Sequence, residues 1–232
     1  MGPMKHVQRG QEHWQQLIDY GAAAQAHTGE LVTGDAYLVQ PFPHGVLVAV
    51  VDGLGHGQAA ATAAQIAIAT LAEYAHDDIV SLVHRCHRAL KGTRGVVMSL
   101  ASLNALADSM AWVGIGNVEG VLLRRKANRS QRQAGIVLRG GIVGYHLPPL
   151  RAAVVPIGPG DILILATDGI HSGFVTEVNL AQSPPQIAAD ILARHARGTD
   201  DAMVLVVRWH GRDTADTGPS GNAADGVRWR ST

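Results

Sequence analysis

Two short apolar runs, each ending in an Asp-Gly pair, constrain the fold of this chain most. Residues 46–51 are followed by Asp52-Gly53, and residues 162–166 are followed by Thr167-Asp168-Gly169. Short uninterrupted runs rich in Val, Ile and Leu and closed by turn residues predict strands that are buried on both faces. The chain must therefore build covered sheets, and it must place carboxylates at the ends of dry strands.

The remaining segments predict strands and helices in separate blocks. Stretches rich in Ala, Leu and Ile predict helices at residues 58–76, 78–91 and 185–195, the second capped by Asp77 or Asp78. Apolar or alternating patterns predict further strands at residues 31–32, 36–39, 96–103, 110–115, 118–125, 136–138, 154–155 and 203–209. This order predicts an α/β layered sandwich (α-β-β-α), with two mostly antiparallel sheets flanked by helix pairs.

Length and composition are those of an ordinary globular protein. The chain has 232 residues, of which 47% are hydrophobic and 16% charged, so it can bury a full core without disulfides or metal staples. We expect one catalytic domain over residues 1–210. Residues 211–232 are rich in Gly, Asp, Ser and Thr, and we expect them to form a disordered tail.

Charge and cysteine content exclude several classes of protein. Lys and Arg together number 19, as do Asp and Glu, so no net field favours nucleic acid or an anionic membrane. The single Cys86 excludes an internal disulfide and a multi-cysteine zinc site. Without a signal peptide or a long apolar stretch, we expect a cytoplasmic location.

Aspartates recur at strand ends and beside them. Asp52 and Asp168 follow the two apolar runs, Asp35 precedes another predicted strand, and Asp200-Asp201 stand just before the last one. A carboxylate beside a dry strand is costly unless a partner neutralises it, and few basic residues lie near these positions. A bound cation is the simplest partner for such a cluster.

The type of ligand indicates the type of metal. Carboxylate and carbonyl oxygens suit Mn²⁺ or Mg²⁺, whereas zinc usually takes His or Cys ligands. Two such ions about 3.5–4 Å apart would share a bridging water and orient it for in-line attack on phosphorus. We therefore expect two ions and hydrolysis without a covalent intermediate.

Five short stretches match one known family in order and spacing. They are Gly34-Asp35, Val51-Asp52-Gly53-Leu54-Gly55-His56-Gly57, Pro159-Gly160-Asp161, Thr167-Asp168-Gly169 and Gly198-Thr199-Asp200-Asp201. On these residues the chain resembles the bacterial SpoIIE-type branch of the type 2C (PPM) metal-dependent serine/threonine phosphatases. The resemblance extends over about residues 30–208.

The resemblance implies a set of functional residues. In the family, acidic residues of these motifs and one backbone carbonyl hold the metals. The positions that match as metal ligands are Asp35, Asp52, Gly53, Asp168, Asp200 and Asp201, and the catalytic set is Asp35, Asp52, Asp168 and Asp200. Asp35 would act directly or through water. Asp200 matches the last ligand better than Asp201 does. The family usually places a Thr after this acidic pair, whereas Ala202 follows here, so we expect this loop to be less firmly positioned.

The resemblance also implies a partner. A catalytic domain without a visible sensor, carrying Asp-Gly-Leu-Gly-His-Gly, is similar to the family members that reset the stressosome. Those members remove phosphate from Ser and Thr of RsbS- and RsbR-type scaffold proteins, which are therefore the expected partners. Two alternatives stay open. One is a phosphatase that acts on a phosphorylated anti-anti-sigma factor, and the other is a catalytically weak module that docks a phosphoprotein.

Other motifs have simpler explanations. The segment Gly114-Ile115-Gly116-Asn117 predicts a bulge or turn within a sheet, because its spacing fits no nucleotide-binding loop. His84, Cys86 and His87 predict a structural role on a helix, since no Glu accompanies them as in a zinc site. The basic run from Arg124 to Arg132 predicts a solvated hairpin that could also meet an acidic partner. The role of His56 stays open.

Overall fold

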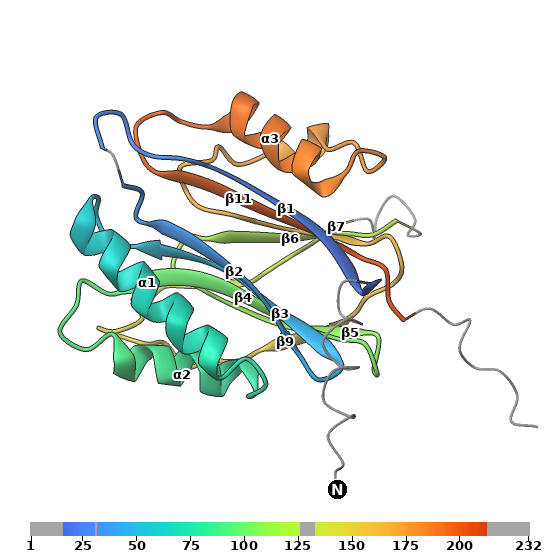
Figure 1. Cartoon of the computed structure of the whole chain (residues 1–232), viewed down its shortest axis with the longest axis horizontal. Helices are drawn as coiled ribbons and strands as arrows, with labels where there is room; N and C mark the ends of the chain where they lie inside the picture. Colours follow the sequence, from blue (N-terminus) through green and yellow to red (C-terminus); the bar gives the residue numbers. More distant parts are fainter. Residues whose placement is uncertain (1–15, 31, 126–132, 213–232) are drawn as a thin grey trace, which may run out of the picture.

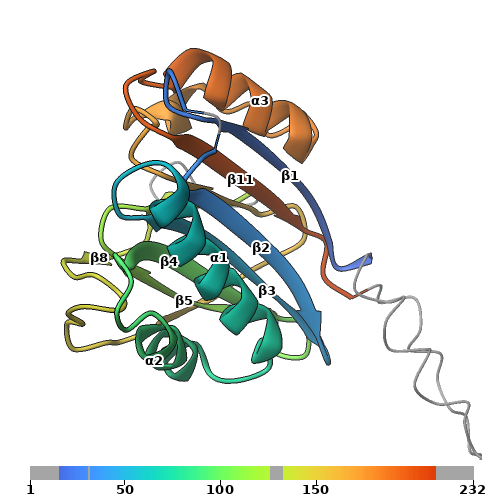
Figure 2. The same ribbon diagram turned by 60° about the vertical axis from the view of Figure 1, so that its left-hand side comes forward.

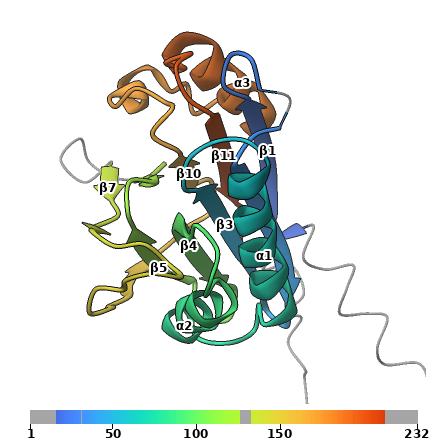
Figure 3. The same cartoon turned by 90° about the vertical axis from the view of Figure 1, so that its left-hand side faces the viewer.

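Two β-sheets pack face to face, and helices cover the outer face of each sheet (Figure 1). The computed structural model describes residues 16–30, 32–125 and 133–212. This layered arrangement confirms the predicted α-β-β-α sandwich. Turning the molecule shows α1 and α2 on one side of the sheets and α3 on the other (Figures 2 and 3).

The first sheet has five strands, and all its neighbouring pairs are antiparallel. Their order is β1 (Ile18–Gln25), β11 (Ala202–Trp209), β10 (Ile162–Ala166), β6 (Glu119–Leu123) and β7 (Gln133–Gly135). The sequence patterns did not predict β1, because most of its residues IDYGAAAQ, namely the Asp, Gly, Ala and Gln, are not favoured in strands. It forms because it pairs with β11 over its full length. Gly21 of β1 also lets Pro185 at the start of a helix approach the strand closely.

The second sheet has six strands. In order they are β2 (Asp35–Phe42), β3 (Gly45–Gly53), β4 (Val96–Asn104), β5 (Ser109–Ile115) and β8 (Leu138–Arg139), with β9 (Ala153–Pro156) also paired to β5. Only the two-residue pairing of β8 with β5 is parallel within the described residues. The sheets are therefore mostly antiparallel, as predicted.

Two predicted strands differ from the structure. The expected strand at residues 136–138 is divided between the sheets: the N–H of Ile136 still bonds the carbonyl of Gly120 in β6, whereas Leu138 pairs with β5 as the start of β8. The expected strand at residues 31–32 is absent at Val32, which lies in a bend before β2, and residue 31 lies outside the described residues.

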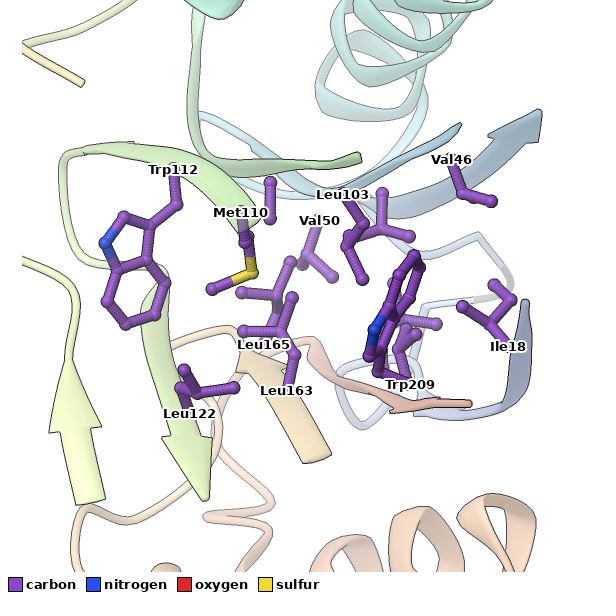
Figure 4. Packing of buried hydrophobic residues seen from close by; sticks show 14 of the residues in the cluster. Ile18, Val46, Val50, Leu103, Met110, Trp112, Leu122, Leu163, Leu165 and Trp209 are labelled. Atoms are coloured by element: carbon purple, nitrogen blue, oxygen red, sulfur yellow. The ribbon is translucent and has the colours of Figure 1, made fainter. Parts of the chain in front are cut away.

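The core between the sheets is built by alternating side chains from both. Val46, Val48 and Val50 of β3 point toward the other sheet, whereas the residues between them face the helices. Figure 4 shows how Trp209 packs near Leu103 in this layer. Each fully buried aliphatic side chain contributes roughly 1.5–3 kcal/mol to folding. This apolar layer ends at the strand ends that carry the aspartates.

Three α-helices of the described residues cover the sheets. Helix α1 (Gln58–Glu73) and helix α2 (Ile79–Ala89) lie on the second sheet, and helix α3 (Pro184–His195) lies on the first. The Asp78 carboxylate caps α2 by accepting hydrogen bonds from the N–H groups of Val80 and Ser81 at 3.1 and 3.0 Å, as one of the two predicted caps. The first sheet carries only α3 and a short 3₁₀ helix (Phe174–Glu177) among the described residues. The expected pair of helices is therefore found on one sheet only.

Candidate active site

Asp35 and Asp52 face each other at the end of a strand pair. Asp35 begins β2, Asp52 lies near the end of β3, and the two residues are direct partners in the antiparallel register. Residues opposite each other in such a pair project to the same face of the sheet. Because Asp52 continues the alternation of Val46, Val48 and Val50, both carboxylates point toward the other sheet.

Thr167 connects these carboxylates to the first sheet. This residue directly follows β10, and its hydroxyl donates a 2.9 Å hydrogen bond to Oδ2 of Asp35. The same hydroxyl oxygen accepts the backbone N–H of Met203 in β11 at 2.9 Å. All three residues are buried. A side chain of one sheet thus fixes the position of an aspartate of the other.

Three aspartates from separate parts of the chain line one pocket. Asp52 comes from β3, Asp168 from the turn after β10, and Asp200 from the loop before β11. His27 and Asn117 also line the pocket. The structure therefore brings together three of the predicted site residues, of which Asp52 lies more than 100 positions before the other two in the sequence.

The adjacent Asp200 and Asp201 have different surroundings. The Asp201 carboxylate is only 5% exposed, and it accepts the backbone N–H groups of His27 at 2.7 Å and Gly34 at 2.6 Å. Asp200 is exposed and lines the pocket, where its Oδ1 accepts the N–H of Asp201 at 2.9 Å. Asp201 thus holds the segment before β2 in place, whereas the carboxylate of Asp200 lies in the pocket.

The glycines after Asp52 and Asp168 permit close backbone contacts. A Cβ atom at Gly53 would collide with the backbone carbonyl of Ala60 in α1, and one at Gly169 would collide with the carbonyl of Asp201. Neither glycine has a positive φ angle. Their function in the fold is therefore close packing, which brings α1 and the loop before β11 against the two Asp-Gly turns.

Asn117 is a site residue that the sequence patterns did not reveal. It lies in the turn after β5, and its amide Nδ2 donates a 2.6 Å hydrogen bond to Oδ2 of Asp168. The Gly114-to-Asn117 segment does form the predicted turn, but this turn also reaches into the pocket. A turn motif carries no information on what its last side chain contacts, so only the folded arrangement identifies Asn117.

Two histidines form one wall of the pocket. Nδ1 of His56 lies 2.8 Å from Oε1 of Glu30, and the His56 ring stacks on that of His27, with 6.1 Å between ring centroids. His27 is tied in turn to Asp201 through its backbone N–H. The loop before β2 and the loop after β3 are thus held together beside the aspartates.

Burial and mutual repulsion raise the pKa values of the aspartates. Burial, then the charge of Asp52, raises the pKa of Asp35 to about 8, although the hydrogen bond from Thr167 opposes the rise. Burial and the charges of Asp168 and Asp200 raise the pKa of Asp52 to about 7. The pKa of Asp168 is also raised, by burial and by Asp200. These carboxylates therefore raise one another's pKa values, and the charge of Arg197 offsets the rise in part at Asp168.

The donor set of this pocket fits a hard divalent cation. Its acidic groups offer only oxygen atoms, and a cation would relieve the repulsion that raises their pKa values. Within the described ranges, no three His, Cys, Asp or Glu side chains lie close enough to form a ready-made metal cage. The carboxylates of Asp52, Asp168 and Asp200 come from separate elements around one pocket, and a bound cation would draw them together as ligands.

Two other predicted features lie away from this pocket. Cys86 is buried, which raises the pKa of its thiol to about 12, and Nδ1 of His87 accepts the N–H of Gly144 at 3.0 Å. Both have the structural role that the sequence predicts.

In the basic run, Arg124 bonds the carbonyl of Pro156 at 2.9 Å, while residues 126–132 lie outside the described residues. Most of the predicted tail, residues 213–232, also lies outside them.

No helix in the described part of the chain is long and apolar enough to cross a membrane.

Comparisons with known proteins identify the same family as the motifs. The family model for stage II sporulation protein E (SpoIIE) matches residues 43–210. The phosphoserine phosphatase RsbX of Bacillus subtilis (strain 168) is 33% identical over 95 residues, which cover 40% of this chain and 47% of RsbX. The match thus spans about half the length of this curated relative.

Solved structures show the same fold. One protein, from work on the bacterial stressosome as a modular system adapted to control secondary messenger signaling, is 31% identical, with a TM-score of 0.76 over 82% of this chain and 99% of its own. A crystal structure of RsbX in complex with magnesium is 20% identical, with a TM-score of 0.75 over 83% of this chain and 96% of its own. The sequence-based prediction of the family is therefore confirmed: the chain belongs to the SpoIIE family and has the fold of a type 2C phosphatase.

Proposed function

We propose that this chain is a metal-dependent phosphoprotein phosphatase that hydrolyses phosphoserine and phosphothreonine. The observation that carries the proposal is the convergence of Asp52, Asp168 and Asp200 from three elements on one pocket. The raised pKa values of Asp52 and Asp168 support it, because they indicate a site that needs a cation. Family membership supports the reaction class.

Two Mn²⁺ or Mg²⁺ ions would be held by Asp52, Asp168, Asp200 and the carbonyl of Gly53. When bound, the ions would supply an activated water for attack on phosphorus and would neutralise charge on the phosphoryl group. RsbX has been crystallised with magnesium, which supports the choice of metal.

Asp35, Asp201 and Asn117 would position these ligands. Asp35 is buried behind the pocket and bonded to Thr167, so it would set the ends of β2 and β3 relative to the first sheet. Asp201 would keep the loop before β11 in place, since both its oxygens already accept backbone N–H groups. Asn117 would orient the Asp168 carboxylate through its amide. We therefore assign Asp200, rather than Asp201, to the metal.

We further propose RsbS- and RsbR-type stressosome scaffold proteins as the substrates, with a cytoplasmic location. The similarity to RsbX and to a protein from the stressosome system supports this choice. The competing candidate is a phosphorylated anti-anti-sigma factor, the alternative that the sequence leaves open.

Hydrolysis of a chromogenic phosphate ester with and without Mn²⁺ tests the chemistry. We expect activity that depends on the added ion and disappears with a chelator. Activity that survives complete chelation would contradict the metal-dependent mechanism, and no activity with either ion would favour the docking module.

Phosphate release from two purified phosphoproteins tests the substrate. An RsbS-type scaffold protein and an anti-anti-sigma factor are compared side by side at equal concentration. Faster release from the scaffold protein is the expected result. Equal rates, or a preference for the anti-anti-sigma factor, would remove the stressosome assignment and leave the phosphatase chemistry in place.

A further inference from the structure

A second groove adjoins the carboxylate pocket. Asp168 and Asn117 line both hollows, so the groove opens directly beside the proposed reaction centre. Its own walls come from the start of β6, from β7 and from the segment after β10, and they include Glu119, Ser172 and Arg197. If a phosphorylated residue of a substrate protein lies in the carboxylate pocket, the residues that flank it in the substrate would therefore lie beside this groove.

The backbone at Arg197 is fixed against the Asp168 turn. The N–H of Arg197 bonds the carbonyl of Gly169 at 2.8 Å, and Ile170 forms a β-bridge with Ala196. These bonds join the end of α3 to the segment that carries Asp168. The backbone segment that carries Asp168 therefore also fixes the position of Arg197.

The side chain of Arg197 has no ion-pair partner among the described residues. Arg197 and Asp168 line the same groove. No ion pair within 4.0 Å joins Arg197 to any carboxylate in the described ranges, whereas Arg194, three residues earlier, pairs with Glu177 at 3.7 Å. An arginine placed only to hold Asp168 would be expected to bond it directly, as Asn117 does.

The location of Arg197 indicates which part of a substrate it would meet. It lines the groove but not the pocket that contains Asp52, Asp168 and Asp200. It is therefore placed for the residues that flank the phosphorylated residue rather than for the phosphoryl group. A guanidinium offers a planar fork of N–H donors that matches a carboxylate. Glu119, which also lines the groove, disfavours an acidic substrate group next to its own carboxylate.

We propose that this groove binds the polypeptide flanking the phosphorylated residue and that Arg197 pairs with one acidic side chain there. The inference rests on the proposed phosphatase function and names a preference of that same site. Arg197 is thus a specificity-determining residue, which makes acid-flanked phosphoserine or phosphothreonine the preferred substrate.

Phosphoserine peptides that differ in one flanking residue test this preference. A panel places Asp, Ala or Lys in turn at each position on either side of the phosphoserine, and kcat and KM are measured with Mn²⁺. For the unmodified chain we expect Asp at one position to improve kcat/KM about three- to fivefold over Ala, mainly through KM, as an exposed ion pair of this kind allows. In the Arg197→Ala variant, the ratio of kcat/KM between the Asp and Ala peptides should fall toward one. In the Arg197→Glu variant, the peptide with Lys should become the preferred substrate.

Arg194→Ala is the matched control. It removes an arginine of the same segment that pairs with Glu177 outside the groove, and the preference for Asp should persist in it. A preference unchanged in Arg197→Ala, or an equal loss on the Asp and Ala peptides, would overturn the role of Arg197 while leaving the phosphatase function in place. No hydrolysis of any peptide or of a chromogenic ester by the unmodified chain would overturn both proposals together.

Discussion

The hydroxyl of Thr167 donates a 2.9 Å hydrogen bond to the carboxylate of Asp35, and this bond joins the ends of the two sheets beside the proposed reaction centre. Asp35 belongs to the second sheet, and Thr167 follows a strand of the first. Because both residues are buried, the bond fixes how the aspartates of one sheet lie relative to those of the other.

Replacing Thr167 by Val should therefore reduce both stability and activity. The substitution keeps the shape but leaves Asp35 and the N–H of Met203 without their shared partner, at a cost of about 1–3 kcal/mol. Chemical denaturation and rates of ester hydrolysis measure the two effects. Thr167→Ser retains the hydroxyl and is the control, and equal behaviour of the two variants would show that the hydrogen bond is unimportant.

Asp52→Asn and Asp168→Asn should each abolish turnover without unfolding the protein. Each removes a charge that the proposed metals need. Each also reduces the repulsion that raises the pKa values in the pocket, so the melting temperature of the metal-free variant should be equal to or above that of the unmodified chain. Near-normal rates in either variant would mean that the aspartates are only structural.

Asp200 and Asp201 should respond differently to the same substitution. Asp200→Asn should cost far more activity, with little change in stability, because its exposed carboxylate lies in the pocket. Asp201→Asn should lower stability, because an amide cannot accept N–H groups at both its positions as the carboxylate does. Its activity should fall by about 10–100-fold, as for residues that orient a metal ligand. The reverse order of activity would move the metal to Asp201.

The stability of the metal-free protein should fall as pH rises from about 4 to about 8. The folded-state pKa values of Asp35 and Asp52 are about 8 and about 7, above the value of 3.8 for a free aspartate. The folded protein therefore binds more protons than the unfolded chain in this window, and the stabilisation present at low pH is lost as these groups ionise. Melting curves across this range, with a chelator, measure the effect.

Added Mn²⁺ should reverse this trend at the upper end of the range, because a bound cation stabilises the ionised carboxylates. Stability that rises between pH 5 and pH 8 in the absence of metal would contradict the electrostatic description of the site. Asp52→Asn should flatten the slope, since it removes one of the two groups that titrate there.

Gly53→Ala and Gly169→Ala should each destabilise the fold severely. The added Cβ atoms would collide with the backbone of Ala60 and of Asp201, and backbone cannot move aside as a flexible side chain can. Gly135→Ala is the control, because no atom lies within 4 Å of a Cβ at that position. Comparable melting temperatures for all three variants would show that the close contacts are dispensable.

The apolar runs and the Asp-Gly pairs of the sequence determined the strands of the core and most of the site. The run before Asp52 is buried throughout, as is the run before Thr167, because such a segment is stable only between covering layers. An aspartate directly after such an apolar run lies at the end of its strand, where its charge can reach solvent or a metal. These relationships are local in the chain, so the sequence alone reveals them.

Only the tertiary structure decided which distant residues support the site. Strand β1 consists mostly of weak strand formers and exists because β11 supplies its partner. Asn117 and Arg197 stand in turns whose local patterns do not indicate what their side chains meet, yet both line hollows that contain Asp168. The different surroundings of Asp200 and Asp201 depend on two N–H groups that lie more than 160 residues away in the chain. Contacts across the two sheets form only when the core closes, and no local pattern encodes them.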